Sequence, residues 1–446
     1  MLLRFTVENA FCFGPEASLS MVASSDDRHN SHVCSGKGSR PDILRVGAIY
    51  GANGHGKTNI VRSIAALRQL VAEQKWSVPR FKLNPLTLNS PTKMIIEFRF
   101  REFDYEYGVI VHGKVVSEEW LFRTSQAGKE AKLFERTSTK TEKGFITNVS
   151  AGSGLRKMKS PVDSVGMDKY LEILSTGLKE TRPFLSEANE RELPLLAPAY
   201  EWIVNVLTPV TATSNYAPLF ERVNSDNEFR AFLQKFMKTC DVGIEELRVH
   251  SIKFDDKLFS NIPANIKEKI HLLENDTIFR IEGDDGVSVA IERDDKGDLI
   301  VKRIGAIRLD PKGKKIDFSF DEESSGTRRL LDLAPMLAES EVERIYVVDE
   351  LDRKLHPMLS YKFVEEFLKK RRDQLILTTH NTHLMDLDLL RRDEIWFVQK
   401  RNDGSSDLYS LAEMKIRPDL NVEKGYINGR FGAIPFLGAF PDIKVN

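Results

Sequence analysis

The feature that most constrains this chain is a glycine-rich octapeptide, Gly51-Ala52-Asn53-Gly54-His55-Gly56-Lys57-Thr58. It fits the pattern G-x-x-x-x-G-K-[ST] at every fixed position, follows an apolar run at 46–50, and precedes a segment with apolar residues at helical spacing. In a strand, loop and helix context, glycines let backbone N–H groups face phosphate oxygens, and the helix start adds partial positive charge. We expect Lys57 to reach the β- and γ-phosphates of a nucleotide and Thr58 to contact Mg²⁺. A plain glycine turn is the alternative.

Composition places the chain among globular proteins. It has 446 residues, of which 41% are hydrophobic and 29% charged, enough for two or three domains or for one large α/β domain with an insertion. No apolar run approaches the roughly 18–20 residues of a membrane-spanning helix, so we expect a soluble, cytoplasmic protein without a membrane partner. The formal net charge of −1 gives no general attraction to nucleic acid, so DNA binding would need a local basic patch.

An apolar run at 344–348 ends in two carboxylates, Asp349 and Glu350. Such a run predicts a buried parallel strand, whose carboxyl end is where α/β sheets bind ligands. We expect Asp349 to hold the Mg²⁺ shell and Glu350 to act as the general base that orients the attacking water. Paired acids after a strand are also common helix caps, which is the alternative for the pair taken alone.

A neighbouring strand is predicted at 374–379, and it delivers His380 to its carboxyl end, where the ring could hydrogen-bond a γ-phosphate. His383 lies three residues further, but the pair lacks a third ligand for zinc. Upstream, Ser324-Ser325-Gly326-Thr327 begins a helical segment, which alone predicts only a helix cap. Near the amino terminus, Phe11 or Phe13 could stack on adenine, although buried aromatics of the core are more common.

The rest of the chain changes character along its length. Alternating runs at 94–100, 105–111 and 118–122 predict an antiparallel meander. The stretch 123–159 is loop-like and basic, residues 162–249 read as helical with several prolines, and strand-like runs resume at 277–303. We interpret the helical part as an inserted subdomain.

In this order, the motifs resemble the ABC-type ATPases related to SMC, RecF and Rad50 proteins. The stretches Asp349-Glu350-Leu351-Asp352-Arg353-Lys354-Leu355-His356-Pro357 and Gly429-Arg430-Phe431-Gly432-Ala433-Ile434-Pro435 are similar to the OLD-like branch, the AAA-family ATPases of prokaryotic defence loci. The resemblance covers residues 1–123 and 305–435. It implies an α/β fold, an ABC-type P-loop ATPase head with an antiparallel β meander and an inserted, mainly helical subdomain. The expected domains are an N-terminal lobe at 1–160, the insertion at 161–250 and a C-terminal lobe at 251–446.

The resemblance also implies roles for single residues. The phosphate loop would use Gly51, Asn53, Gly54, Gly56, Lys57 and Thr58; the signature would use Ser325, Gly326 and Thr327; and Asp349, Glu350, Asp352 and His380 would serve as magnesium ligand, base, coupling residue and switch histidine. The cofactors would be ATP and Mg²⁺. The family's glutamine loop has no counterpart here, since Gln69 and Gln74 lie on the first helix and Gln126 in the basic stretch.

In the family, nucleotide is held between two heads, so we expect a homo-oligomer built from head-to-tail dimers. The function we expect is that of an ATP-hydrolysing subunit in an anti-phage defence complex of the PARIS-like or Septu-like kind. It would sense a phage-encoded trigger and control a separate effector, a nuclease. The alternative is an ATPase clamp of the RecF or SMC kind that acts on DNA in repair.

Overall fold

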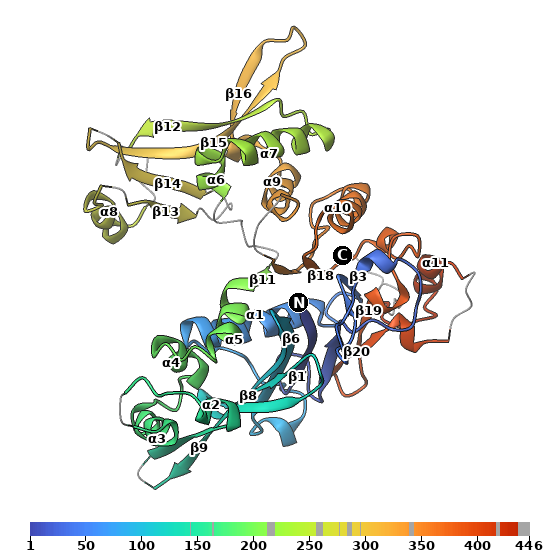
Figure 1. Cartoon of the computed structure of the whole chain (residues 1–446). Helices are drawn as coiled ribbons and strands as arrows, with labels where there is room; N and C mark the ends of the chain where they lie inside the picture. The colour runs from blue at the N-terminus through green and yellow to red at the C-terminus, as the bar shows by residue number, and fades with distance from the viewer. Residues whose placement is uncertain are drawn as a thin grey trace, which may run out of the picture. The chain divides into compact units, whose positions relative to one another are not determined.

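The computed structural model describes residues 1–142, 144–162, 165–211, 219–255, 262–275, 277–282, 288–294, 296–338, 343–415 and 420–435 (Figure 1). The chain divides into two compact units. Unit 1 comprises residues 1–212, 341–351 and 372–446, and unit 2 comprises residues 213–340 and 352–371. Within the described ranges, no helix has the length and apolar character needed to cross a bilayer.

A six-stranded sheet with the order β11-β17-β18-β5-β19-β20 forms one part of unit 1. Its strands are β11 (Leu207–Val210), β17 (Ile345–Val348), β18 (Gln374–Thr378), β5 (Val46–Tyr50), β19 (Ile395–Lys400) and β20 (Ser406–Ser410). All neighbours are parallel except β20, which pairs antiparallel with β19. Every residue of β5, β17 and β18 is buried, as expected for parallel strands covered on both faces. Their carboxyl ends therefore meet at one edge of the sheet.

The second large sheet of unit 1 is antiparallel and has the order β10-β9-β8-β7-β6-β1-β2. It consists of β1 (Leu2–Glu8), β2 (Ala17–Ser20), β6 (Thr92–Phe100), β7 (Phe103–His112), β8 (Val115–Thr124), β9 (Glu130–Thr141) and β10 (Gly144–Ala151), and a small pair, β3 (Val33–Cys34) with β4 (Ile43–Leu44), lies outside it. The predicted meander is confirmed.

The prediction of a loop at 123–159 is wrong, because this stretch contains strands β9 and β10. Its exposed basic residues dilute the alternation of apolar side chains, yet Leu133, Phe134 and Val149 are buried in the core. The side chain of Arg136 is also buried and donates to the carbonyl oxygen of Val116 at 2.6 Å.

The helices expected as one insertion at 161–250 are divided between the units. Helices α3 (Met167–Gly177), α4 (Phe184–Glu190) and α5 (Ala197–Glu201) belong to unit 1, as does α2 (Ser153–Arg156), which precedes the expected insertion. Trp202, which follows α5, is buried and stacks on Phe98 of β6 with ring centroids 4.0 Å apart. The buried carboxylate of Glu119 in β8 accepts hydrogen bonds from the first amides of α4, at 2.6 Å from Phe184 and 2.9 Å from Leu185. Apolar burial and this cap attach these helices to the meander, so the predicted boundaries differ from those of the structure.

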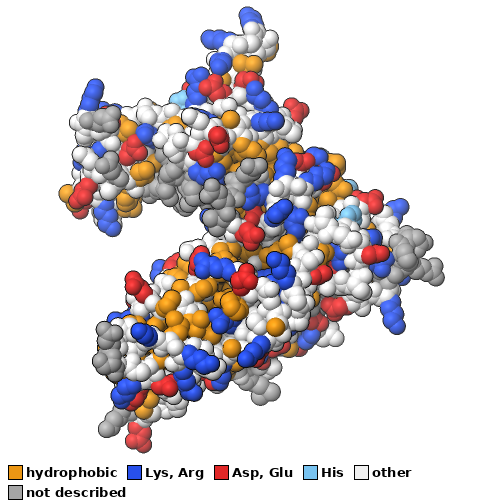
Figure 2. Space-filling model, in the orientation of Figure 1, with side chains coloured by type: hydrophobic (Ala, Val, Ile, Leu, Met, Phe, Trp, Pro, Cys, Tyr) orange, Lys and Arg blue, Asp and Glu red, His pale blue; other side chains and the backbone are white. Residues whose placement is uncertain are grey.

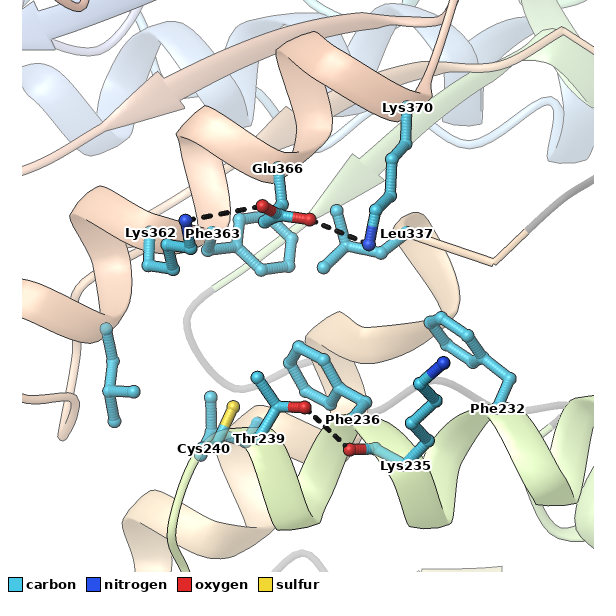
Figure 3. A pocket seen from close by; sticks show the side chains of 12 residues that line it. Phe232, Lys235, Phe236, Thr239, Cys240, Leu337, Lys362, Phe363, Glu366 and Lys370 are labelled. Atoms are coloured by element: carbon cyan, nitrogen blue, oxygen red, sulfur yellow. Dashed lines mark hydrogen bonds and ion pairs between the residues drawn. The ribbon is translucent and has the colours of Figure 1, made fainter.

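Unit 2 packs helices on a five-stranded antiparallel sheet. Its strands are β12 (Glu246–Lys253), β13 (Phe279–Glu282), β14 (Ser288–Arg293), β15 (Leu299–Leu309) and β16 (Lys315–Ser319), and its helices are α6 (Leu219–Ser225), α7 (Asn227–Thr239), α8 (Ala264–His271), α9 (Ser325–Leu333) and α10 (Pro357–Lys370). An apolar cavity of about 290 Å³ lies between α7 and α10, lined by Phe232, Phe236 and Phe363 with lysines at its rim (Figure 3). None of the predicted site residues lines it.

Candidate functional site

The glycine-rich loop joins β5 to helix α1 (Lys57–Glu73), as the sequence predicts. Gly54 and Gly56 have φ of 78° and 110°, in the left-handed region that favours glycine. A Cβ at Gly56 would lie 2.4 Å from Sγ of Cys12, and a Cβ at Gly51 would lie 2.5 Å from the carbonyl oxygen of Val398. Backbone conformation and close packing therefore both require glycine in this loop.

Helix α1 begins without a side-chain cap, because Gly56 occupies the N-cap position. The first amides of a helix have no partner within the helix, and together with the helix dipole they attract anions. Asn53 and Gly54 are exposed at the tip of the loop. This start of α1 therefore fits a phosphate group.

Lys57 lies inside the loop. Its ammonium group donates to the carbonyl oxygen of Gly51 at 2.6 Å and to that of Ala52 at 3.4 Å, and the residue is only 6% exposed. A buried cation held by loop carbonyls is well placed to meet a phosphate anion that enters the same loop.

Thr58, on the first turn of α1, donates a hydrogen bond from its hydroxyl to Oδ1 of Asp349 at 3.1 Å. Asp349 follows β17, and the two residues meet because β17, β18 and β5 are parallel neighbours. A hydroxyl and a carboxylate side by side provide oxygen ligands of the kind that Mg²⁺ prefers. The pair therefore fits the predicted metal site.

The sequence did not identify Thr378, the last residue of β18, as part of the site. Its buried hydroxyl donates to Oδ1 of Asp349 at 2.7 Å and accepts a hydrogen bond from the backbone N–H of Glu350 at 2.8 Å. Thr378 thus orients both predicted acids. The only sequence signal was a hydroxyl residue at the end of a buried strand.

Glu350 has φ of 47°, which is uncommon for a residue with a side chain. Such conformations cluster at functional sites and persist where neighbours hold them, as Thr378 does here. The chain passes from unit 1 to unit 2 directly after Leu351, so Asp352 belongs to unit 2, where its carbonyl oxygen accepts a hydrogen bond from Leu355 N at 3.0 Å.

His380 lies two residues after β18 ends and is exposed at the edge of the sheet that also carries the glycine-rich loop and Asp349. The neighbouring Asn381 is buried, its N–H donating to Oγ1 of Thr379 at 2.9 Å. The structure thus brings the loop, Asp349, Glu350 and His380 to one edge of one sheet.

The predicted signature residues begin helix α9 in unit 2. Ser324 is the N-cap and accepts a hydrogen bond from the N–H of Thr327 at 3.1 Å, while the hydroxyls of the two residues lie 2.9 Å apart. Because Thr327 is buried in this cap, Ser325 and Gly326 are the more accessible predicted residues. A Cβ at Gly326 would lie 2.7 Å from the carbonyl oxygen of Lys354, so the chain after Asp352 packs tightly on the start of α9.

The acid that precedes this helix is neutralised. The buried carboxylate of Glu323 accepts two hydrogen bonds from Arg308, at 3.0 Å from Nε and 2.6 Å from Nη2. An uncompensated carboxylate here would repel an anion at the helix start. The ion pair therefore leaves the start of α9 compatible with a phosphate.

Further sequence candidates have other surroundings. Phe13 is fully buried in the core, and Phe11 is partly buried with φ of 54°. His55 is partly buried; burial lowers its pKa, more than a hydrogen bond to the Val398 backbone raises it. The amide of Gln126 donates to Glu102 at 2.6 Å in an exposed turn.

A glycine-rich strand-to-helix loop with a buried lysine, next to a Thr and Asp pair, defines a P-loop nucleotide-binding protein. A family model described as "AAA domain, putative AbiEii toxin, Type IV TA system" matches residues 47–156 and 221–386, which is more than half of the chain. The chain belongs to this family, and it is an ATPase of the AAA type.

Comparisons with solved structures give distant similarities. The SMC head domain from Thermotoga maritima is 14% identical with a TM-score of 0.36, over 93% of this chain and 99% of that one. An Smc head domain bound to the C-terminal domain of ScpA, derived from Pyrococcus furiosus, is 13% identical with a TM-score of 0.30, over 96% and 98% of the two chains. No curated protein matches the sequence.

Proposed function

We propose that this chain binds and hydrolyses ATP with Mg²⁺ as the catalytic subunit of an anti-phage defence complex. The observation that carries the ATPase part is the contact between Thr58 and Asp349 at 3.1 Å beside the buried ammonium group of Lys57. This contact supports the proposal, because a hydroxyl, a carboxylate and an ammonium group beside the start of one uncapped helix are the groups that bind Mg²⁺ and phosphate in nucleotide sites of this kind.

Each residue has a distinct task in this proposal. The amides of residues 51–57 and the Lys57 ammonium group bind the β- and γ-phosphates, and Thr58 and Asp349 hold Mg²⁺. The metal, when bound, supplies positive charge that offsets the charge on the phosphate oxygens. Glu350 accepts a proton from the attacking water while the water oxygen bonds to the γ-phosphorus. The bond between the γ-phosphorus and the oxygen that bridges it to the β-phosphate breaks, and ADP leaves. His380 donates a hydrogen bond to a γ-phosphate oxygen.

We further propose that the catalytic unit is a head-to-tail dimer. Ser325 and Gly326 begin helix α9 beside an ion pair that neutralises Glu323, so this helix start can accept an anion. In the dimer, this surface of one subunit would close on the nucleotide held by the loop of the other. ATP binding would then drive the association.

A mixing experiment tests this shared site. Lys57→Ala removes the phosphate-binding cation and Ser325→Arg blocks the helix start, so each variant alone is expected to be inactive. A mixed dimer contains one site with both elements intact, so an equimolar mixture should recover up to about a quarter of the wild-type sites. No recovery, although mixed dimers form, would contradict the shared site. Activity of Ser325→Arg alone would do so as well.

The defence role rests on the family description, which refers to a toxin of a type IV toxin–antitoxin system. In this role, a phage-encoded trigger changes the ATP-dependent assembly, and the assembly holds or releases a separate effector, a nuclease. Expression of the chain with its neighbouring gene, compared with the Lys57→Ala variant, should protect cells from phage only when Lys57 is present. Equal protection by both would contradict an ATP-dependent role.

The alternative function, a clamp on DNA, has less support from the surface charge. Among the basic residues of 123–159, Arg136 is buried, Lys132 pairs with Glu135 and Arg156 pairs with Asp168, and Lys143 lies outside the described residues. On the face in Figure 2, basic and acidic side chains are interspersed. Salt-dependent DNA binding that is lost on neutralising Lys129 and Lys140 would favour the alternative.

A further inference from the structure

Helix α11 (Val422–Ile427) contacts the segment that carries His380, and no role described so far uses this helix. The carboxylate of Glu423 accepts a hydrogen bond from the hydroxyl of Thr382 at 2.7 Å and lies 3.5 Å from Nδ1 of His383. Both partners follow His380 closely in the chain. Glu423 therefore holds the carboxyl-terminal side of the His380 segment.

The other side of this segment is held by the sheet. Thr379 is buried next to the end of β18, and its N–H donates to the carbonyl oxygen of Ile49 in β5 at 3.1 Å. Asn381 then caps the short helix at Thr382–Leu384 by accepting a hydrogen bond from the N–H of His383 at 3.1 Å. The exposed His380 therefore lies between strand β18 and the short helix at Thr382–Leu384, which Glu423 contacts through Thr382 and His383.

Helix α11 is itself fixed to the same sheet. Tyr426 stacks on Phe397 of β19 with ring centroids 5.6 Å apart, and its hydroxyl donates to the carbonyl oxygen of Ala433 at 3.1 Å. Phe431 also stacks on Phe397, at 5.8 Å, and its carbonyl oxygen accepts a hydrogen bond from Tyr409 at 2.7 Å. Figure 1 shows α11 near β19. These contacts hold helix α11 and the residues that follow it against strand β19.

Helix α11 also contacts β5, the strand that leads into the phosphate loop. The ring of Tyr426 lies 6.2 Å from that of Tyr50, the last residue of β5. Tyr50 directly precedes Gly51, so α11 packs on the base of the loop while Glu423 holds the segment after β18. One element thus contacts both parts of the edge where nucleotide is expected.

We propose that Glu423 is a positioning residue, which acts through Thr382 and His383 to hold His380 where it meets the γ-phosphate. This inference rests on the proposed function, because it needs a nucleotide at the loop. The geometry makes the carboxylate a remote determinant of the discrimination between ATP and ADP. A contact that orients a group in the site contributes through the precision of its placement.

The test compares Glu423→Ala with Lys424→Ala, a control at the adjacent exposed position of α11. Affinities for ATP and ADP are measured by titration of the full-length protein with fluorescent analogues, together with kcat, KM and Tm. We expect Glu423→Ala to lower kcat and the preference for ATP over ADP by about tenfold, with ADP affinity and Tm close to wild type. Glu423→Gln, which keeps an acceptor for Thr382, should recover most of this loss.

Two further variants separate this inference from the proposed function. His380→Ala should lose the same preference, and adding Glu423→Ala to it should cause no further loss, because both act through one contact. If His380→Ala lowers the preference and Glu423→Ala does not, the positioning role is wrong while the proposed function stands. If His380→Ala does not change the preference for ATP over ADP, His380 does not contact the γ-phosphate, and the positioning role of Glu423 is wrong as well. Equal losses of ATP and ADP affinity with a lower Tm in Glu423→Ala would show a merely structural contact.

Discussion

The hydroxyl of Thr58 lies 3.1 Å from a carboxylate oxygen of Asp349, although 291 positions separate the two residues in the chain. The contact exists because β5 and β17 both flank β18 and all three strands run in the same direction. Thr378, at the end of the intervening strand, completes the arrangement by donating to the same oxygen. The site is therefore a property of the sheet order.

Replacing Lys57 with Ala should weaken ATP binding. Hydrogen bonds to charged groups contribute about 1.5–3 kcal/mol, so the affinity should fall about tenfold or more. Calorimetric titration with ATP and Mg²⁺ measures this loss. Lys75→Ala, which removes a lysine whose side chain is 70% exposed after α1, is the control and should bind like wild type. Unchanged affinity in Lys57→Ala would exclude the loop as the phosphate site.

Replacing Glu350 with Gln should separate binding from turnover. The amide keeps the size of the side chain but cannot accept the proton of the attacking water, so kcat should fall by about 10²–10⁴-fold. ATP should remain bound, and light scattering after size-exclusion chromatography should show a trapped assembly in its presence. Turnover at the wild-type rate would rule out Glu350 as the base.

Replacing Thr378 tests a residue that supports the site through hydrogen bonds to Asp349 and to the backbone of Glu350. Thr378→Val retains the shape but removes the hydroxyl, leaving the N–H of Glu350 and Oδ1 of Asp349 with one partner fewer. The expected loss of stability is about 1–3 kcal/mol, accompanied by lower kcat, and chemical denaturation with steady-state kinetics measures both. Thr378→Ser keeps the hydroxyl and should behave much more like wild type. Equal behaviour of the two variants would contradict the role of the hydroxyl.

Gly326→Ala tests the close approach between helix α9 and the segment after Asp352. The added Cβ would lie 2.7 Å from the carbonyl oxygen of Lys354, a backbone atom that cannot turn aside as a side chain could. We expect a destabilisation of about 1–3 kcal/mol and weaker ATP-driven assembly. Gly177→Ala is a matched control, since the structure describes no atom within 4 Å of a Cβ at Gly177. If the two variants have the same free energy of unfolding, the close packing at Gly326 does not contribute to stability.

Some features of this molecule follow from short stretches of its sequence. The loop at 51–58 and helix α1 could be predicted because glycines and helical periodicity act over a few residues. Strands β17 and β18 could be predicted for the same reason, since a continuous apolar run indicates burial on both faces. By contrast, the sequence predicts a loop over β9 and β10, because polar and charged residues such as Lys140 and Asn148 obscure the alternation of apolar side chains in two strands that are held by pairing with β8 and with each other.

The sequence by itself determined the chemistry of the site, namely a glycine-rich loop with Lys57 and Thr58, two acids after a strand, and a histidine after the next. Only the tertiary structure decided which of these groups share one sheet edge, that Thr378 orients Asp349 and Glu350, that Glu423 grips the segment after His380, and that helices α3 to α5 belong to unit 1. The reason is physical. Local conformation depends on neighbouring residues, whereas strand order and buried hydrogen bonds depend on packing between segments hundreds of residues apart.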